Sequence, residues 1–187
     1  MRLSKSFFER PVDQVARALI GAVVLVDGVG GRIVETESYD AEDPASHAYQ
    51  MRLTARNATM LGPPARAYVY RSYGIHWCLN FVCEPGSAVL IRALEPLAGI
   101  KAMRRRRGMT KHSLLCAGPG RLCQALGIDR RLDGASLLRP PFALTLPDSE
   151  RAILQGPRIG LTKAAEVHRR FGERDSLFLS RRFAEAS

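Results

Sequence analysis

Two glutamates lie two residues apart in the stretch V-E-T-E-S-Y-D at 34–40. Alternate side chains of a β-strand point to the same face, so Glu35, Glu37 and Tyr39 are expected to share one face. Two carboxylates and a phenol on one face of an otherwise apolar strand fit a general base beside an aromatic wall. They fit a solvated sheet face equally well, and the spacing alone does not choose between the two glutamates.

A second group of chemically useful side chains is the aromatic run Y-V-Y-R-S-Y-G-I-H-W at 68–77. Tyr68 and Tyr70 are expected on one face of a strand, where aromatic residues commonly pack into a core. Tyr73 directly precedes Gly74, at what the pattern predicts to be the tip of a turn. Stacking on a base or insertion into a duplex would explain a tyrosine at an exposed turn better than packing does.

Basic residues form the third group. Four consecutive arginines, Arg104–Arg107, follow Lys101, and the chain of 187 residues has a formal net charge of +10. Arginines at a helix end are favourably placed against the helix dipole, so a solvated basic surface is one explanation. Contact with the phosphates of a nucleic acid is the other, and it makes a polyanionic partner the sharper hypothesis.

The cysteines and glycines argue against several other classes of site. Cys78, Cys83, Cys116 and Cys123 do not have the paired spacing of a zinc site, so we expect buried, reduced thiols and no metal or cofactor. The glycines of G-P-G-R-L-C-Q-A-L at 118–126 do not match a phosphate-binding loop. The sequence shows no signal peptide and no membrane-spanning run, which predicts an intracellular protein.

The elements that must position these groups follow from periodicity and turn residues. Residues 40–66 are polar, contain prolines and predict a long irregular loop. Helices are expected over 6–20, 97–107 and 120–126, and strands over 22–26, 32–39, 67–71, 75–83, 87–93, 141–146 and 176–180. Strands in hairpin order with helices at one side predict an α+β fold with a curved, mainly antiparallel sheet, formed by one domain over residues 1–187.

Several segments, in this order along the chain, resemble one protein family. It is the alkyladenine (3-methyladenine) DNA glycosylase family of the mammalian type, which differs from the helix-hairpin-helix type. The resemblance runs from Ser6 to Leu161, and the segments are V-E-T-E-x-Y at 34–39, His47, T-x-R-N at 54–57, Y-V-Y-x-x-Y-G at 68–74, L-I-R-A-L-E-P at 90–96, G-P-G-R-L-C-Q-A-L-G-I at 118–128 and P-R-I-G-L at 157–161.

The resemblance implies a role for residues at a catalytic centre. Glu37 occupies the position of the general base, which resolves the choice that the strand pattern leaves open. Arg92 matches an arginine that helps to hold the attacking water, and the carbonyl of Ile159 matches a further water contact.

The resemblance also implies a pocket for a flipped base. Tyr39 on one side, with His47 and Tyr70 on the other, matches an aromatic sandwich around that base. Asn80 matches the residue that rejects undamaged guanine through its exocyclic amine.

Further residues match positions at the DNA surface. Tyr73 matches a side chain that enters the minor groove from a protruding hairpin turn and fills the space left by the flipped base. Residues that contact or flank the DNA backbone and the intercalation site are, on the same basis, Thr54, Arg56, Met60 and Arg107. The sequence departs from the family pattern after residues 163–167, where H-R-R-F-G-E-R-D at 168–175 replaces an aromatic final strand.

The function implied is that of a base-excision repair glycosylase that acts on double-stranded DNA. Such an enzyme flips out an alkylated or deaminated purine of the 3-methyladenine, 7-methylguanine or hypoxanthine type and hydrolyses its N-glycosidic bond. It leaves an abasic site, acts as a monomer without metal or cofactor and, in a bacterium, works at the nucleoid. A non-catalytic binding protein for damaged DNA and a hydrolase of free nucleosides are the alternatives.

Overall fold

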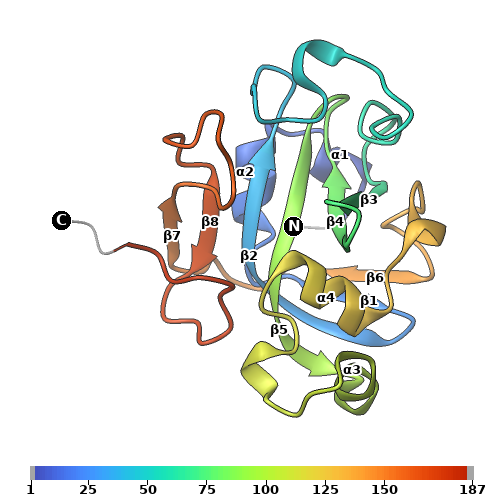
Figure 1. Ribbon diagram of the computed structural model, residues 1–187, viewed down its shortest axis with the longest axis vertical. Helices are drawn as coiled ribbons and strands as arrows, with labels where there is room; N and C mark the ends of the chain where they lie inside the picture. Colours follow the sequence, from blue (N-terminus) through green and yellow to red (C-terminus); the bar gives the residue numbers. More distant parts are fainter. Residues whose placement is uncertain (1–2, 185–187) are drawn as a thin grey trace.

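A computed structural model describes residues 3–184. Its strands join in one sheet, in the order β3-β4-β5-β2-β1-β6, with β8 against β2 and β7 against β8, and every pairing is antiparallel. The strands are β1 Val23–Val26, β2 Val29–Tyr39, β3 Ala67–Ser72, β4 His76–Val82, β5 Ala88–Ala98, β6 Phe142–Thr145, β7 Ile153–Gly156 and β8 Arg170–Glu173. Figure 1 shows the sheet curling around β5 and β2, which confirms the predicted α+β fold with a curved antiparallel sheet.

Helices lie on both faces of this sheet (Figure 1), whereas the sequence pattern predicts them at one side. The α-helices are α1 Lys5–Phe8, α2 Val12–Ala18, α3 Ile100–Arg107 and α4 Pro119–Leu126, and short 3-10 turns cover Tyr49–Met51, His112–Leu114 and Arg130–Leu132. α2 packs behind β2, and α4 lies in front of β4 and β5 with α3 below it (Figure 1). The face in front of the upper halves of β2 and β5 is left to loops and side chains.

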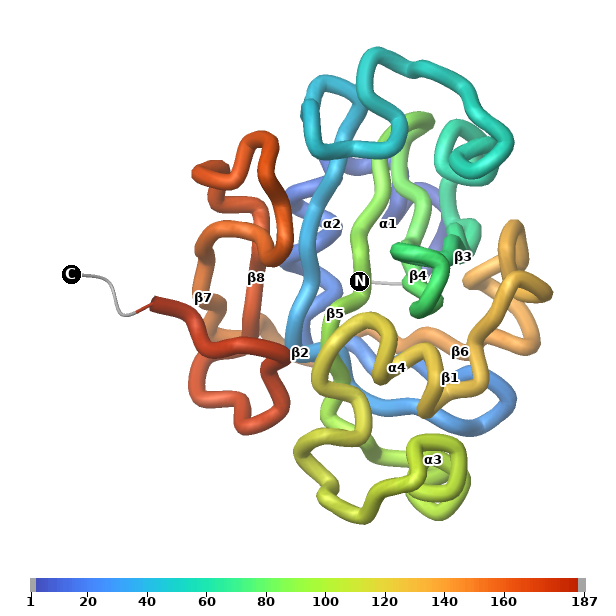
Figure 2. The backbone as a smooth tube through the Cα atoms, viewed as in Figure 1, coloured from blue at the N-terminus to red at the C-terminus, as the bar shows by residue number. Residues whose placement is uncertain are grey.

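β2 is the strand on which the rest of the site depends. It pairs with β5 along one edge, and its other edge is shared between β1, which pairs with residues 29–32, and β8, which pairs with residues 35–37. The backbone of Glu37 therefore lies between Leu90 of β5 and Arg170 of β8. Figure 2 shows the loop 157–169 between β7 and β8 running alongside the same half of β2.

The hydrophobic core lies between the sheet and the helices. Phe8, Leu19, Phe81, Ile91 and Phe171 are among its fully buried side chains. A smaller apolar cluster lies under the loop 40–66 and comprises Ala48, Met60, Tyr68, Val82 and Ala88, with Tyr39, Leu61 and Tyr70 packed against it. This second cluster fixes the aromatic side chains that face the loop side of the sheet.

Three of the expected elements need correction. The helix predicted over 6–20 is two short helices, because Pro11 interrupts it between α1 and α2. The helix predicted from residue 97 starts at Ile100, since β5 continues to Ala98 before Gly99 adopts a left-handed conformation. The strand predicted over 176–180 is absent from the described residues there, and the strands of this region are β7 and β8 instead.

Most other expectations about the chain agree with the structure. The turn between β4 and β5 falls at residues 83–87, between two predicted strands, whereas the hairpin of β1 and β2 turns at Asp27 and Gly28, so β2 starts at Val29 and not at residue 32. All four cysteines are buried and free, which confirms the predicted thiols. In residues 3–184, no helix has the length and apolar character needed to cross a membrane. The extent of the single domain, 1–187, stays a prediction.

Candidate active site

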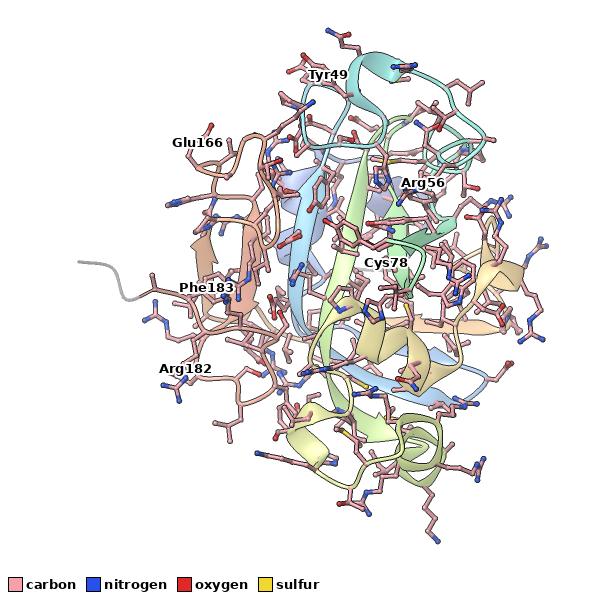
Figure 3. The ribbon with its side chains drawn as sticks, viewed as in Figure 1. Tyr49, Arg56, Cys78, Glu166, Arg182 and Phe183 are labelled. Carbon is pink, nitrogen blue, oxygen red and sulfur yellow. The ribbon has the colours of Figure 1, made fainter. Side chains whose placement is uncertain are left out.

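A cavity of about 530 Å³ opens on the loop side of the sheet. Its walls come from β2, β3, β4 and β5, from the loops 40–66 and 157–169, and from the start of α4. Figure 3 labels two of the lining residues, Arg56 on the loop before β3 and Cys78 on β4. Ten of the residues singled out from the sequence line it: Glu37, Tyr39, His47, Arg56, Met60, Tyr70, Tyr73, Asn80, Arg92 and Ile159.

Glu37 is fully buried by its neighbours and lines the cavity. Its Oε1 accepts a hydrogen bond from the backbone N–H of Ile159 at 2.8 Å and lies 3.2 Å from Nη1 of Arg92. Its Oε2 accepts a hydrogen bond from the hydroxyl of Tyr39 at 2.8 Å. A carboxylate offers about four acceptor positions, so one position beside the cavity remains for a further donor.

Ile159 has a contact with Glu37 that the sequence did not indicate. Its amide N–H donates to the carboxylate, while the predicted contact of its carbonyl with the attacking water stays a prediction. This bond ties the loop 157–169 to the carboxylate and fixes the orientation of the carboxylate plane.

Glu35 is equally buried but does not line the cavity. Its Oε1 accepts hydrogen bonds from Nε of Arg92 at 3.0 Å, Nε of Arg170 at 2.7 Å and the hydroxyl of Ser180 at 2.8 Å. Its Oε2 accepts the backbone N–H of Ser180. Both glutamates contact Arg92, as expected for side chains on one strand face, and the expectation of a solvated face is wrong.

The segment that brings Ser180 to Glu35 packs across β7 and β8. The ring of Phe183 lies over these strands, beside β8 in Figure 3. A Cβ atom on Gly172 would lie 2.4 Å from this ring, so only glycine permits the close approach. The guanidinium of Arg170 also stacks on this ring, and its central carbon lies 3.9 Å from the ring centroid of Phe183. Residues 178–183 therefore complete the surroundings of Glu35.

Aromatic side chains form two walls above Glu37. Tyr39, His47 and Tyr70 all line the cavity, and the rings of His47 and Tyr70 meet edge to face with centroids 4.6 Å apart. Tyr68 stands behind them: its hydroxyl lies 3.0 Å from Nδ1 of His47 and its ring centroid 5.3 Å from that of Tyr70. The side chains expected to form a sandwich are thus brought together around one space.

The walls carry no charge near neutral pH. Desolvation by the surrounding rings, followed by the charge of Arg56, lowers the pKa of His47 to about 4, although part of the residue is exposed at the cavity mouth. Burial raises the pKa of Tyr70, and burial together with the nearby Glu37 raises the pKa of Tyr39. Neutral aromatic faces are suited to stacking on a planar ring.

Asn80 lies deeper, on β4, and is 4% exposed. Its side-chain amide donates to the backbone carbonyl of Tyr68 at 3.0 Å, which fixes the amide plane beside the cavity. A fixed amide in a buried wall can discriminate between donors and acceptors on the edge of a bound ring.

Tyr73 projects from the tip of the hairpin between β3 and β4. It is 86% exposed, the highest value among the large apolar side chains described in residues 3–184. Tyr73 and Gly74 both have positive φ, and the N–H of Ile75 bonds the carbonyl of Ser72, which is a type I′ turn. A tyrosine is strained in this conformation, and such strain is typical of functional positions.

The remaining predicted DNA-contact residues have different surroundings. Arg56 lines the cavity and lies 4.9 Å from the ring centroid of Tyr70. Met60 is buried in the second apolar cluster, in the cavity wall. Thr54 bonds the side chain of Asn57, whose amide in turn holds the carbonyl of His47 at 2.6 Å.

Arg107 lies apart from the cavity. It is at the end of α3, and its Nε donates to the carbonyl of Leu115 while its Nη1 contacts the side chain of Gln124 on α4. Its role in DNA contact stays a prediction, and its observed contacts join α3 to α4.

Sequence reasoning did not find several residues that shape the site. Arg170 and Ser180 lie beyond the recognised motifs, Arg158 lies inside the last of them, and each contacts a partner more than 100 positions away. The pair Arg158 and Asp43 could have been suspected only from a charge in each of two loops. No group of three or more metal-ligating side chains occurs within the part of the chain that the structure describes.

Comparison with known proteins agrees with this geometry. Residues 6–177 match the methylpurine-DNA glycosylase family. The chain belongs to this family. The match includes every element that lines the cavity and ends just before the segment that caps Glu35.

Bacterial relatives are similar over nearly their whole length. A candidate 3-methyladenine DNA glycosylase of Nitrosospira multiformis is 59% identical over 174 residues, which are 91% of this chain and 90% of the relative. Proteins with the same description from Agrobacterium fabrum and Rhizobium meliloti are 56% and 58% identical, over 96% and 95% of this chain and 92% and 95% of their own. This member of the family therefore has close relatives that share its full fold.

Proposed function

We propose that this protein is a monofunctional DNA glycosylase of base-excision repair. It takes up a flipped alkylated or deaminated purine, of the 3-methyladenine, 7-methylguanine or hypoxanthine type, and hydrolyses its N-glycosidic bond with a water held by Glu37. The observation that carries the proposal is the buried Glu37 carboxylate, which lines the cavity between two aromatic walls.

The size and position of the cavity support base flipping. The C1′ atom of a stacked nucleotide is out of reach of a protein carboxylate, so the nucleotide must leave the duplex first. A volume of about 530 Å³ is ample for a purine. In this proposal Tyr73, exposed at the tip of its turn, fills the space that the base leaves in the stack.

The walls support recognition of damaged purines. Alkylation makes a purine electron-poor or cationic, and such a ring gains from stacking on the neutral faces of Tyr39 and Tyr70. His47, neutral at pH 7, adds an edge that accepts or donates one hydrogen bond without repelling a cationic base. Asn80 provides the fixed amide with which the pocket excludes an ordinary guanine.

The chemical step rests on Glu37. Glycosidic cleavage develops positive charge on the sugar, which an anionic carboxylate stabilises while it orients water by its remaining acceptor position. Arg92, held by Glu35, fixes one side of that carboxylate. The lining residues include no lysine that could form a Schiff base, which supports simple hydrolysis to an abasic site.

Base release from defined duplexes tests the proposal. Each duplex of a panel contains one lesion, and the purified protein is expected to release the damaged purine in the presence of EDTA and to leave an uncut abasic strand. Release from free nucleosides but not from duplexes, or binding without release, would contradict it. A dependence of release on added divalent metal would contradict the water-and-carboxylate mechanism.

Binding to DNA rests on charge. With a net charge of +10, the affinity for duplex DNA is expected to fall steeply as salt rises, because phosphate contacts release counterions. Action as a monomer at the nucleoid inside the cell is part of this proposal.

A further inference from the structure

Arg158 lies behind one wall of the cavity. Its guanidinium carbon is 4.6 Å from the ring centroid of Tyr39. Tyr39 lines the cavity and Arg158 does not, which indicates that the cation covers the ring face turned away from the cavity. The side chain of Arg158 has no exposed surface, which keeps water from screening its charge.

Asp43 holds this arginine in place. Nη1 and Nη2 of Arg158 both bond the Asp43 carboxylate, the latter at 3.1 Å, and Nη1 also donates to the carbonyl of Ser38 at 3.1 Å. The Asp43 side chain is only 3% exposed. Nε of Arg158 is buried without a hydrogen-bond partner among the described residues, so the ring of Tyr39 is a principal neighbour of the cation.

This ion pair connects three parts of the site. Asp43 belongs to the loop that carries His47 to one wall. Arg158 covers Tyr39 of the other wall, and its chain neighbour Ile159 donates the hydrogen bond to Glu37. Together with the ion pairs of Arg169 to Asp40 and Asp43, this buried contact therefore holds the two loops beside the carboxylate.

A cation on one face of an aromatic ring also affects the other face. A cation is attracted to an aromatic ring by the negative potential over the ring face. The first cation offsets this potential and also repels a second cation on the opposite face. A cationic purine that stacks on Tyr39 meets this opposition, whereas a neutral purine does not. The ion pair of Arg158 and Asp43 therefore affects how strongly the pocket prefers cationic purines over neutral ones.

We propose that Arg158, held by Asp43, is a positioning and specificity-determining residue that limits the preference of the pocket for positively charged purines over neutral ones. The proposal rests on the function proposed above and adds the residue that sets its substrate balance. Removal of the charge should make the pocket favour cationic lesions more strongly.

Competition between two lesions in one reaction measures this balance. Two duplexes of the same sequence carry different dyes, one with N7-methylguanine, which is cationic, and the other with hypoxanthine, which is neutral. The ratio of their cleavage rates gives the ratio of kcat/KM for the two lesions, and a parallel reaction without enzyme corrects for spontaneous loss of N7-methylguanine.

Two variants should move the ratio in opposite directions. Asp43→Leu with Arg158→Leu removes the pair as a unit and should raise the cationic-to-neutral ratio about two- to five-fold. Asp43→Asn leaves the cation without its counter-charge and should lower the ratio. The control is Asp129→Asn with Arg131→Gln, which removes an ion pair that contacts neither Asp43, Arg158 nor the cavity and should leave the ratio unchanged.

The outcomes separate the two proposals. Loss of activity on both lesions in equal proportion, or a shift of both variants in the same direction, would overturn the role of the Arg158 charge and leave only a structural role. If the double variant does not fold, the direction of the Asp43→Asn shift alone decides. A wild-type protein that releases neither base would instead refute the proposed function.

Discussion

Glu35 and Glu37 occupy neighbouring positions on one face of β2, and both carboxylates are fully buried, yet their surroundings differ in kind. Glu35 accepts four hydrogen bonds, from Arg92, Arg170 and twice from Ser180, and faces no cavity. Glu37 has three contacts and lines the cavity beneath the aromatic walls. The two residues have the same type and the same burial. They differ in the number of hydrogen-bond donors around the carboxylate and in whether the carboxylate lines the cavity.

The comparison shows how one strand can hold both a carboxylate enclosed by donors and a carboxylate that lines a cavity. The buried cluster of Glu35, Glu37, Arg92 and Arg170 has two charges of each sign, so its net charge is zero. Arg170 and Ser180 neutralise and saturate Glu35, which leaves Arg92 to bridge to Glu37. The first carboxylate positions the arginine, and the second remains able to bind water.

The largest expected effect is on turnover. Glu37→Gln removes the proposed general base and should reduce the rate of base release by about 10²- to 10⁴-fold, while affinity for damaged duplex DNA is retained. Single-turnover release and equilibrium binding on the same duplex measure the two quantities. Full activity in this variant would mean that the carboxylate facing the cavity is not the base.

Glu35→Gln should show the opposite pattern. Removal of this charge leaves Arg170 buried without its carboxylate, and breaking a buried ion pair costs about 3–5 kcal/mol in the free energy of unfolding. Denaturant unfolding measures the loss, with Glu37→Gln as the matched comparison, since Arg92 keeps Glu35 as a partner there. Equal destabilisation by the two variants would remove the distinction between the carboxylates.

Ser180→Ala sharpens the comparison with a smaller change. It deletes the hydroxyl that donates to Oε1 of Glu35 and leaves the backbone N–H in place. A hydrogen bond to a charged group contributes about 1.5–3 kcal/mol, so the free energy of unfolding should fall by this amount or less. Turnover should fall modestly, because Glu35 positions Arg92 beside Glu37. Ser149→Ala, at an exposed position, is the control, and an unchanged unfolding free energy for Ser180→Ala would contradict the capping role.

The smallest expected effect is on the pH dependence of the free energy of unfolding, through His47 in the cavity wall. The pKa of His47 is lowered to about 4 by desolvation and then by Arg56, so between pH 6.5 and 4 the unfolded chain binds a proton that the folded chain does not. Stability should therefore fall as pH decreases through this window, less steeply in His47→Gln than in the wild type. Unfolding curves at several pH values measure the slopes, with His168→Gln as the control on an exposed loop. Parallel slopes in wild type and His47→Gln would show that His47 is not desolvated.

Local patterns predicted the strands around the site well. Alternation placed Glu35, Glu37 and Tyr39 on one face of β2. Thr36 points to the opposite face, where its hydroxyl donates to the carbonyl of Ala16 on α2. Turn residues located Tyr73 at a hairpin tip. These features depend on interactions within a few residues or between adjacent strands, which sequence patterns record.

The C-terminal part could not be predicted in the same way. β8 has the sequence R-F-G-E, and two of its four residues are charged, yet all four are buried. A charged strand is stable there only because Arg170 meets Glu35 and Glu173 meets Arg32, partners more than 130 positions earlier in the chain. Short-range periodicity contains no information about such pairings, and an apolar stretch at 176–180 was the stronger local signal.

The contact between Ser180 and Glu35 spans 145 positions of the chain, and this separation has a kinetic consequence. We expect contacts of such long range to form late in folding, because the ordering of a large loop opposes them. The charge cluster beneath Glu37 is then completed only when this last segment docks. Local opening of the segment would uncover the cluster without unfolding the sheet. Hydrogen exchange at the Ser180 amide, compared with that of the β2 amides, would report how often the enzyme passes through this unassembled state.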